Sequence, residues 1–289
     1  MSEVKIALRE IPTATVDAVE YTHLDYYSDV KPVWCPGCGD YPVLAALTSA
    51  LAELALPPED VALVSGIGCS SRIPAYTKVY GFHGVHGRAL PIATGLKLAR
   101  PELTVLVAGG DGDGFSIGGN HFLHACRRNV DMTYIIMDNQ VYGMTKGQAS
   151  PTTDPHWTGS QLTPEGSGLN PFRLLGLAVS AEANYIARTF SGDPVHLAET
   201  LIEAINHPGF SVVQILSPCV TFRPEQRNWK DMVRPMRHEA TSDRLTAGFR
   251  INDEDGFDMG LIYKSSRQVY QCEHNNKMDV SSLGEEFTV

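Results

Sequence analysis

Residues 103–147 read LTVLVAGGDGDGFSIGGNHFLHACRRNVDMTYIIMDNQVYGMTKG, and this stretch decides the fold. Its two short apolar runs, residues 103–108 and 133–137, contain β-branched residues and are bounded by Gly, Asp or Asn, which indicates buried parallel strands. Between them, residues 116–128 have helical length and an apolar repeat. A right-handed crossover brings both strand ends to one edge of the sheet. The stretch therefore predicts an α/β protein with a doubly wound, mostly parallel sheet.

Polar residues follow both predicted strands. We expect Asp111 and Asn139 to meet at one ion, because each comes directly after a strand end. The Asp111 carboxylate, the Asn139 amide oxygen and the Val141 carbonyl are oxygen ligands that suit Mg²⁺, with a diphosphate supplying further oxygens. The glycines of GGDGDG let the backbone approach that diphosphate closely. The pattern points to thiamine diphosphate. An acidic turn that caps a helix is the plainer alternative.

Two of the six cysteines form a tight knuckle. Cys35 and Cys38 lie in WCPGCGD, where Pro36 and Gly37 bend the chain. In a chain that we expect to be cytoplasmic, disulfides are disfavoured, so metal binding or core packing is the choice. The knuckle alone fits zinc, mononuclear iron or an iron–sulfur cluster equally well.

Two further cysteines, Cys69 in GIGCSSR and Cys219 in SPCVTF, each follow a predicted strand. They are expected at the same sheet edge as the diphosphate site, where open α/β sheets bind ligands. A dispersed Cys₄ set beside a cofactor that generates electrons favours a [4Fe-4S] cluster over zinc. We expect Cys126 to pack in the core, and Cys272 has no partner in sequence.

Composition fits an enzyme subunit. The chain has 289 residues, with 43% hydrophobic and 19% charged, and a net charge of −10 that argues against general nucleic-acid binding. No secretory signal or run of 18 apolar residues occurs, so we expect a cytoplasmic protein that does not span a membrane. One basic segment, residues 223–237, is either a solvated or subunit-contact surface, or a docking site for an acidic electron carrier or coenzyme phosphates.

Patterning along the chain predicts three regions: an N-terminal arm, loosely ordered or in contact with a partner (1–30), a cofactor-binding α/β domain (31–222), and a C-terminal extension that contacts a partner subunit (223–289). Regular patterning fades beyond about residue 222. The further expected elements are helices at 41–54, 91–99, 170–176 and 196–206, strands at 61–65, 178–181 and 210–216, and a long loop at 148–169.

The motifs WCPGCG, GIGCSSR, HGVHGRA, GGDGDG, DNQVYGMTKGQ and SPC together resemble the β subunit of 2-oxoacid:ferredoxin oxidoreductases, most closely the 2-oxoglutarate type. The resemblance covers about residues 30–225. It implies the diphosphate-binding half of a thiamine-dependent enzyme with one [4Fe-4S] cluster. An α subunit would supply the pyrimidine-binding half and the activating glutamate, in a heterotetramer of two α and two β subunits. The implied reaction oxidatively and reversibly decarboxylates 2-oxoglutarate with coenzyme A to succinyl-CoA and CO₂, and passes electrons to ferredoxin.

The resemblance also implies residue roles. Cys35, Cys38, Cys69 and Cys219 would bind the cluster, and Asp111, Asn139 and the Val141 carbonyl would bind Mg²⁺. The residues that would line thiamine diphosphate are Ile67, Gly68, Cys69, Ser70, His86, Gly112, Asp113, Gly143 and Met144.

Two candidate catalytic residues have plainer alternatives. Lys146 could pair with a carboxylate of the oxoacid or of the coenzyme, or be an ordinary exposed lysine. His86, like His83, could contact substrate or cofactor, or bond only to backbone.

Three other functions remain open at this point: the same chemistry on pyruvate or other 2-oxoacids, a non-oxidative thiamine-dependent decarboxylase or synthase, and a metal-knuckle interaction protein. The second would not need four cysteines, and the third leaves Asp111 and Asn139 unexplained.

Overall fold

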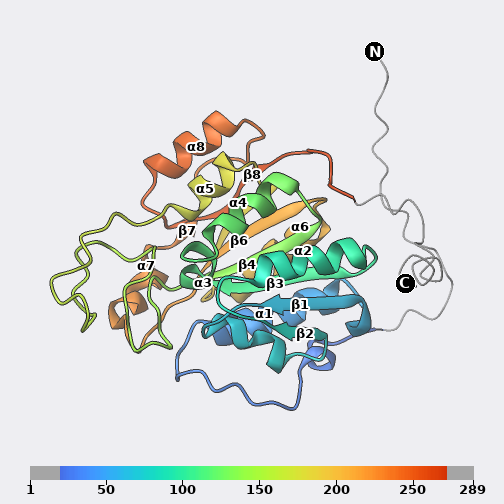
Figure 1. Ribbon diagram of the computed structural model, residues 1–289, viewed down its shortest axis with the longest axis horizontal. Coiled ribbons are helices and arrows are strands. Elements are labelled where there is room, and N and C mark those ends of the chain that lie inside the picture. Colours follow the sequence, from blue (N-terminus) through green and yellow to red (C-terminus); the bar gives the residue numbers. More distant parts are fainter. Residues whose placement is uncertain (1–19, 272–289) are drawn as a thin grey trace, which may run out of the picture.

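The computed structural model describes residues 20–271, and its centre is one eight-stranded sheet (Figure 1). The strand order is β2-β1-β3-β4-β6-β5-β8-β7. All pairings from β2 to β5 are parallel, and β8 pairs antiparallel with β5. The strands are β1 (Val61–Ser65), β2 (Tyr80–His83), β3 (Thr104–Gly110), β4 (Met132–Asp138), β5 (Tyr185–Phe190), β6 (Phe210–Leu216), β7 (Arg234–Pro235) and β8 (Asp258–Lys264).

Parallel pairing puts the carboxyl ends of β1, β3, β4 and β6 at one edge of the sheet. The register pairs Ser65 with Ala108 and Gly110 with Met137, so the segments after β1, β3 and β4 leave the sheet side by side. Asp138 pairs with Leu216, which brings the segment after β6 to the same edge. Residues far apart in sequence thus meet there, as open α/β sheets require of a ligand site.

Two layers of helices cover the sheet. On one face, α2, α4, α5 and α8 pack on a core that includes Phe122, Tyr134 and Phe210. On the other, α1 and α6 pack on a core that includes Leu47 and Ile135. The helices are α1 (Asp40–Glu53), α2 (Ala89–Ala99), α3 (Asp111–Phe115), α4 (Gly119–Arg128), α5 (Leu174–Ser180), α6 (Pro194–Asn206), α7 (Trp229–Met232) and α8 (Arg244–Asp253), with 3₁₀ turns η1 (His23–Tyr26), η2 (Pro58–Asp60), η3 (Ser70–Tyr76) and η4 (Pro224–Asn228).

One predicted strand is wrong. Residues 178–181, expected as a strand, belong to or directly follow α5, and the strand in this region is β5 at Tyr185–Phe190. A short apolar run cannot be assigned to helix or strand by periodicity alone, and its Ala and Leu content favours the helix. The charged Arg188 lies within β5 and is only 5% exposed, so this buried strand does not appear in the sequence as an apolar run. The edge strand β2, whose four residues are all exposed, was also missed.

The expectation that regular structure fades beyond residue 222 is wrong as well. Within the described residues, β8 extends the sheet next to β5, and α8 packs with α5 on the same core. Only Ala247 and Ile251 of α8 are buried, while Leu245 and Phe249 are exposed. Buried and exposed apolar residues therefore alternate along α8, and the sequence does not show a single apolar face. The sheet therefore does not end at the expected boundary.

The described part of the predicted N-terminal arm is packed on the domain. The Tyr26 side chain is fully buried, and its hydroxyl donates to the carbonyls of Leu51 (3.0 Å) and Leu56 (2.6 Å). Residues 1–19 and 272–289, which include Cys272, lie outside the described residues. In the described part, no helix is long and apolar enough to cross a membrane.

Candidate functional site

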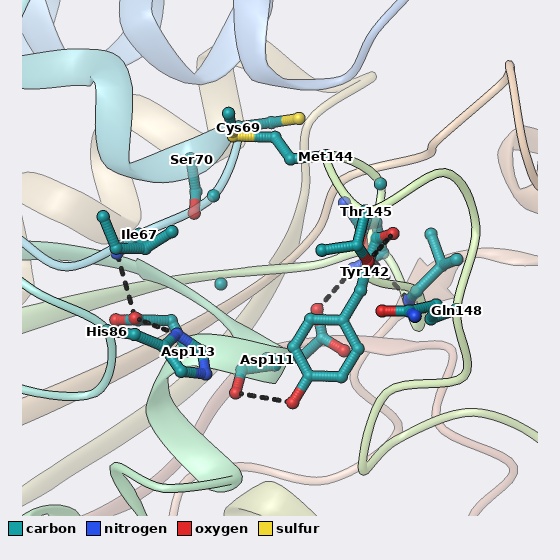
Figure 2. Close-up of a pocket in the computed structure, with 16 residues that line it drawn as sticks. Ile67, Cys69, Ser70, His86, Asp111, Asp113, Tyr142, Met144, Thr145 and Gln148 are labelled. Atoms are coloured by element: carbon teal, nitrogen blue, oxygen red, sulfur yellow. Dashed lines mark hydrogen bonds and ion pairs between the residues drawn. The ribbon is translucent and has the colours of Figure 1, made fainter.

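A cavity opens at the carboxyl edge of the sheet, between the segments that follow β1, β3 and β4 (Figure 2). It gathers all twelve residues that the sequence analysis predicted for thiamine diphosphate and Mg²⁺. Those that line it are Ile67, Gly68, Cys69, Ser70, His86, Asp111, Gly112, Asp113, Asn139, Val141, Gly143 and Met144. Gly110, one of the GGDGDG glycines expected at the diphosphate, lines it too, and the sequence did not indicate three further lining residues, Tyr142, Thr145 and Gln148.

Asp111 and Asn139 lie together, as their spacing predicted. The Asn139 backbone N–H donates to Asp111 Oδ1 at 3.5 Å, a long contact, and Asn139 Oδ1 accepts from the Val141 N–H at 3.1 Å. The second Asp111 oxygen accepts from the hydroxyls of Ser150 and Thr152, the latter at 2.7 Å. Ser150 and Thr152 belong to the loop after the cavity, and nothing in their sequence context distinguished them.

The charge around Asp111 suits a divalent cation. The Asp111 carboxyl is 1% exposed, and burial together with the neighbouring Asp138 carboxyl raises its pKa. Burial raises the pKa of Asp138 in the same way. A cation bound by Asp111, Asn139 and the Val141 carbonyl would supply the positive charge that two adjacent buried carboxyls need. These residues therefore fit the expected Mg²⁺.

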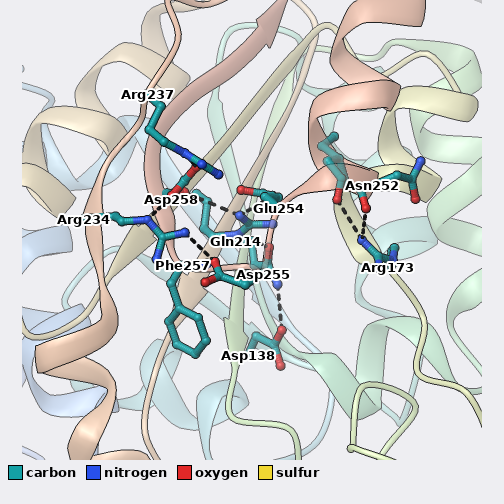
Figure 3. A network of polar contacts seen from close by, with 12 residues as sticks. Asp138, Arg173, Gln214, Arg234, Arg237, Asn252, Glu254, Asp255, Phe257 and Asp258 are labelled. Carbon is teal, nitrogen blue, oxygen red and sulfur yellow. Dashed lines mark hydrogen bonds and ion pairs between the residues drawn. The ribbon is translucent and has the colours of Figure 1, made fainter.

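Asp138 is tied to a buried ion pair on the other side of β6 (Figure 3). Gln214 Nε2 donates to Asp138 Oδ2 at 2.7 Å, and Arg188 Nε donates to Gln214 Oε1 at 2.9 Å. Arg188 also pairs with Glu254 at 2.5 Å, and both side chains are nearly buried. A continuous polar chain thus fixes the end of β4, where the candidate ion ligands begin.

The basic segment at residues 223–237 is mostly engaged within the chain. Arg234 and Arg237 both pair with Asp258, at 2.6 and 2.9 Å (Figure 3), and Arg223 pairs with Glu225. These ion pairs join residues of the extension to one another, and the count of charges in the sequence could not reveal them. Of the five basic residues, Arg227, Lys230 and Arg237 are exposed.

Asp113 fastens two loops of the cavity. Its Oδ1 accepts from the backbone N–H groups of Ile67 (2.9 Å) and Gly87 (2.7 Å), and it contacts His86 Nδ1 at 2.9 Å (Figure 2). Facing a carboxylate, Nδ1 carries the proton, so His86 Nε2 is the nitrogen left to act as an acceptor. His83 differs from His86, because its ring nitrogen contacts the Ser71 carbonyl at 2.8 Å and the residue does not line the cavity.

Gly112 leaves room that a side chain would fill. A Cβ at this position would lie 2.3 Å from Cε1 of Tyr142. The Tyr142 hydroxyl donates to the Gly112 carbonyl at 3.2 Å and closes this wall of the cavity. The close approach explains why glycine follows Asp111.

The cysteine knuckle docks on the segment after β6. The Cys38 N–H donates to the Cys35 carbonyl at 3.0 Å, and Gly37 between them has a φ of +81°, which favours glycine. The Gly39 N–H donates to the Pro218 carbonyl at 3.1 Å. This contact brings the knuckle beside Cys219.

The four cysteines predicted as ligands gather next to the cavity. A Cβ on Gly143 would lie 3.7 Å from Sγ of Cys69 and equally far from Sγ of Cys219, so both sulfurs flank this lining residue. Burial, followed by the nearby Asp40 and the other thiols, raises the pKa of Cys38 and Cys69. Burial also raises the pKa of Cys219.

The arrangement of these thiols fits a cluster. Among residues 20–271, no three His, Cys, Asp or Glu side chains converge tightly enough to hold a single ion. Thiolates that bind different iron atoms of a [4Fe-4S] cluster need not converge on one point. Cys35 is the exposed member of the group, and Cys126 is fully buried in the core as expected.

Lys146 does not line the cavity. It is exposed and has a φ of +67°, and its backbone N–H donates to the Gly143 carbonyl at 3.1 Å. Its neighbour Met144 does line the cavity and is 56% exposed.

Comparison with known families identifies the domain. Residues 66–215 match the family described as thiamine pyrophosphate enzyme, C-terminal TPP binding domain. A solved structure of 2-oxoglutarate:ferredoxin oxidoreductase from Magnetococcus marinus, with 2-oxoglutarate, coenzyme A and succinyl-CoA bound, superposes with a TM-score of 0.84. It is 41% identical and covers 93% of this chain and 92% of its own.

Curated relatives agree with that match. The 2-oxoglutarate oxidoreductase subunit KorB of Mycobacterium tuberculosis is 48% identical over 198 residues, which are 68% of this chain and 53% of the relative. The 2-oxoglutarate synthase subunit KorB of Archaeoglobus fulgidus is 39% identical over 249 residues, 85% of this chain and 89% of the relative. For two β subunits of Aeropyrum pernix 2-oxoacid:ferredoxin oxidoreductases, the match spans 64% and 62% of their length. The chain thus spans between half and two thirds of several relatives.

Proposed function

The chain belongs to the family of 2-oxoacid:ferredoxin oxidoreductase β subunits, and we propose that it is the diphosphate-binding subunit of an enzyme that oxidatively decarboxylates 2-oxoglutarate. The products are succinyl-CoA and CO₂, and ferredoxin accepts the electrons. One observation carries the proposal: Cys69 and Cys219 flank Gly143 of the cavity that fits the diphosphate and its ion. A non-oxidative thiamine enzyme would have no use for thiols at this place.

The chain's own residues would hold the two cofactors. Asp111, Asn139 and the Val141 carbonyl bind Mg²⁺, because they are adjacent oxygen donors and Asp111 needs a compensating charge. Bound there, thiamine diphosphate supplies the carbon nucleophile and electron sink for cleavage beside the keto group, and a [4Fe-4S] cluster takes up electrons singly. The cluster ligands are Cys35, Cys38, Cys69 and Cys219.

The cavity wall orients the cofactor. Asp113 holds the loops at Ile67 and Gly87 in place, and Gly112 keeps the wall free of a side chain. His86, fixed by Asp113, presents Nε2 as a hydrogen-bond acceptor beside the reacting groups. Lys146, which directly follows the lining residue Thr145, pairs with a carboxylate of the oxoacid or the coenzyme. Unchanged apparent affinities for both in Lys146→Ala would remove that role.

The site is incomplete in this chain alone. Within the described residues, the cavity lining contains no glutamate to activate the cofactor. We therefore propose that an α subunit supplies that glutamate and the pyrimidine-binding half, in an assembly of two α and two β subunits in the cytoplasm. Leu245 and Phe249, 84% and 71% exposed on α8, support a partner contact within residues 223–289.

The preference for 2-oxoglutarate is supported by the relatives. The solved structure from Magnetococcus marinus, 41% identical to this chain, has 2-oxoglutarate, coenzyme A and succinyl-CoA bound. The Aeropyrum pernix relatives are named for 2-oxoacids in general, so pyruvate and other 2-oxoacids are the second candidate substrates.

A reduction assay tests the proposal. The chain is co-expressed with its α subunit, purified without oxygen, and offered 2-oxoglutarate, pyruvate and branched-chain oxoacids in turn with coenzyme A and ferredoxin. We expect brown protein that reduces ferredoxin fastest with 2-oxoglutarate, while the chain alone is inactive. Colourless protein with stoichiometric zinc would refute the redox function, and a faster reaction with pyruvate would change the substrate.

A further inference from the structure

One buried side chain joins the two proposed cofactor sites. Gln226 lies in η4 and is 1% exposed. Its Nε2 donates to the Asn139 carbonyl at 2.7 Å, and its Oε1 accepts from the Cys219 N–H at 2.8 Å. We propose that Gln226 is a positioning residue that fixes the ion-binding turn at Asn139 relative to the cluster ligand Cys219. The inference rests on the proposed function and deepens it.

The two partners require a primary amide. The Asn139 carbonyl can only accept, and the Cys219 N–H can only donate, so the bridging group must present a donor and an acceptor side by side. A carboxylate lacks the donor and a thioether side chain lacks both in useful strength. Both bonds are partly buried, so each broken one leaves a backbone group that has lost its partner.

The Asn139 bond acts on the ion site through local geometry. Asn139 Oδ1 accepts from the Val141 N–H, so the carbonyl that Gln226 holds belongs to the same tight turn. The turn presents two of the three proposed Mg²⁺ ligands, the Asn139 side chain and the Val141 carbonyl. Rotation of the Asn139 carbonyl away from Gln226 would therefore displace both.

The Cys219 bond acts on the cluster in the same way. Cys219 lies in the short connection between β6 and η4, and its carbonyl accepts from the Arg223 N–H at 2.8 Å. With Gln226 on its N–H, both backbone groups of Cys219 are bound, so the backbone that carries its side chain is held in place. Its sulfur lies 3.7 Å from where a Cβ of Gly143 would be, directly beside the cavity.

A second contact keeps Gln226 in place. Arg223 donates to the Gln140 carbonyl at 3.0 Å, one residue after Asn139, and its guanidinium lies 4.6 Å from the ring centre of Trp157. The Gln226 N–H donates in turn to the Arg223 carbonyl at 3.0 Å. The turn that carries Gln226 is thus itself anchored, through Arg223, to the loop that it positions.

The test uses Gln226→Met and Gln226→Glu in the anaerobic complex with the α subunit. Three quantities are measured: the Mg²⁺-dependent affinity for thiamine diphosphate by fluorescence titration, the iron content, and the electron paramagnetic resonance spectrum of the chemically reduced cluster. Gln161→Met and Gln161→Glu, at an exposed position of the long loop, are the matched controls. Thermal melting of every variant reports loss of fold.

We expect Gln226→Met to weaken thiamine diphosphate binding about 10- to 100-fold and to change the line shape of the reduced cluster, with the iron content of the wild type. Gln226→Glu should weaken thiamine diphosphate binding similarly but keep the wild-type line shape, because it still accepts from Cys219. Weaker thiamine diphosphate binding with an unchanged line shape in Gln226→Glu would not arise from a role in folding alone.

Two results would overturn the inference: wild-type affinity and spectrum in Gln226→Met, or parallel loss of iron, cofactor affinity and thermal stability in both Gln226 variants. A wild-type complex that binds neither iron nor thiamine diphosphate would instead overturn the proposed function itself.

Discussion

Replacing Asp113 by asparagine removes the charge from a carboxylate that fastens two loops of the cavity. The substitution is nearly isosteric, so the remaining oxygen can still accept from the N–H groups of Ile67 and Gly87. Hydrogen bonds to a charged acceptor are worth about 1.5–3 kcal/mol and those between neutral groups about 0.5–1.5 kcal/mol. Each backbone bond therefore loses about 1–1.5 kcal/mol, which gives a loss of about 2–3 kcal/mol in the free energy of unfolding. The His86 contact is not counted, because that side chain is 40% exposed.

The loss is measured by thermal and urea unfolding of the cofactor-free protein, together with titration of thiamine diphosphate in the presence of Mg²⁺. At about 2–4 °C per kcal/mol for larger domains, the melting temperature should fall by about 4–12 °C. Cofactor affinity should fall by about tenfold, because the loops at Ile67 and Gly87 form part of the cavity wall.

Asp154→Asn is the matched control. Asp154 is exposed and accepts from one backbone group, the His156 N–H. Its replacement should change stability by less than about 0.5 kcal/mol. If Asp113→Asn unfolds and binds the cofactor like Asp154→Asn, the assigned role of Asp113 is refuted.

Three other predictions concern the walls and ligands of the site. Gly112→Ala should weaken thiamine diphosphate binding by about tenfold or more in calorimetric titration, since the new methyl group would lie 2.3 Å from the Tyr142 ring and overpacking costs about 1–3 kcal/mol; wild-type affinity would contradict it. Cys219→Ser should lower the iron content and the absorption of the cluster yet leave the affinity for thiamine diphosphate within about threefold of the wild type, because the backbone N–H at position 219 still donates to Gln226. An iron content equal to that of the wild type would show that Cys219 is not a cluster ligand. Mg²⁺-dependent binding of thiamine diphosphate should weaken as the pH is lowered from about 8 to about 6. Burial and the Asp138 carboxyl raise the pKa of Asp111, and only the ionised form of Asp111 binds the cation. An affinity for thiamine diphosphate that stays constant or rises on acidification would refute this.

The central part of the fold could be predicted from sequence because its signals are local. The β3–β4 unit has apolar strands with clear ends, and parallel pairing then dictates that Asp111 and Asn139 meet. Helix α1 and helix α2 also lie where Ala and Leu content and a proline in the first turn indicated.

Other parts depend on contacts that no local pattern encodes. The charged Arg188 is buried in β5 because Gln214 and Glu254 bind it, and these partners lie 26 and 66 residues away in sequence. Strand β8 joins the sheet beside β5, and Arg234 and Arg237 bind Asp258 at its start. The roles of these residues follow from tertiary pairing, so the sequence alone suggested only a basic, irregular extension.

The candidate site also has residues that the sequence could indicate and residues that only the tertiary structure reveals. The cysteines and the Asp111 and Asn139 pair could be proposed from their places after strand ends. The roles of Gln226 and Thr152 could not be proposed in this way. Each acts through a hydrogen bond to a residue that is distant in sequence: Asn139 lies 87 positions from Gln226, and Asp111 lies 41 positions from Thr152.

Electron paramagnetic resonance of the anaerobic complex with its α subunit tests the central claim most directly. The oxidised protein is mixed with 2-oxoglutarate in the absence of ferredoxin, and the spectrum is recorded at low temperature. We predict that a reduced [4Fe-4S] signal develops, that it requires bound thiamine diphosphate, and that it is lost in Cys219→Ser. A complex that binds thiamine diphosphate and contains iron, but develops no cluster signal with any 2-oxoacid, would contradict the account.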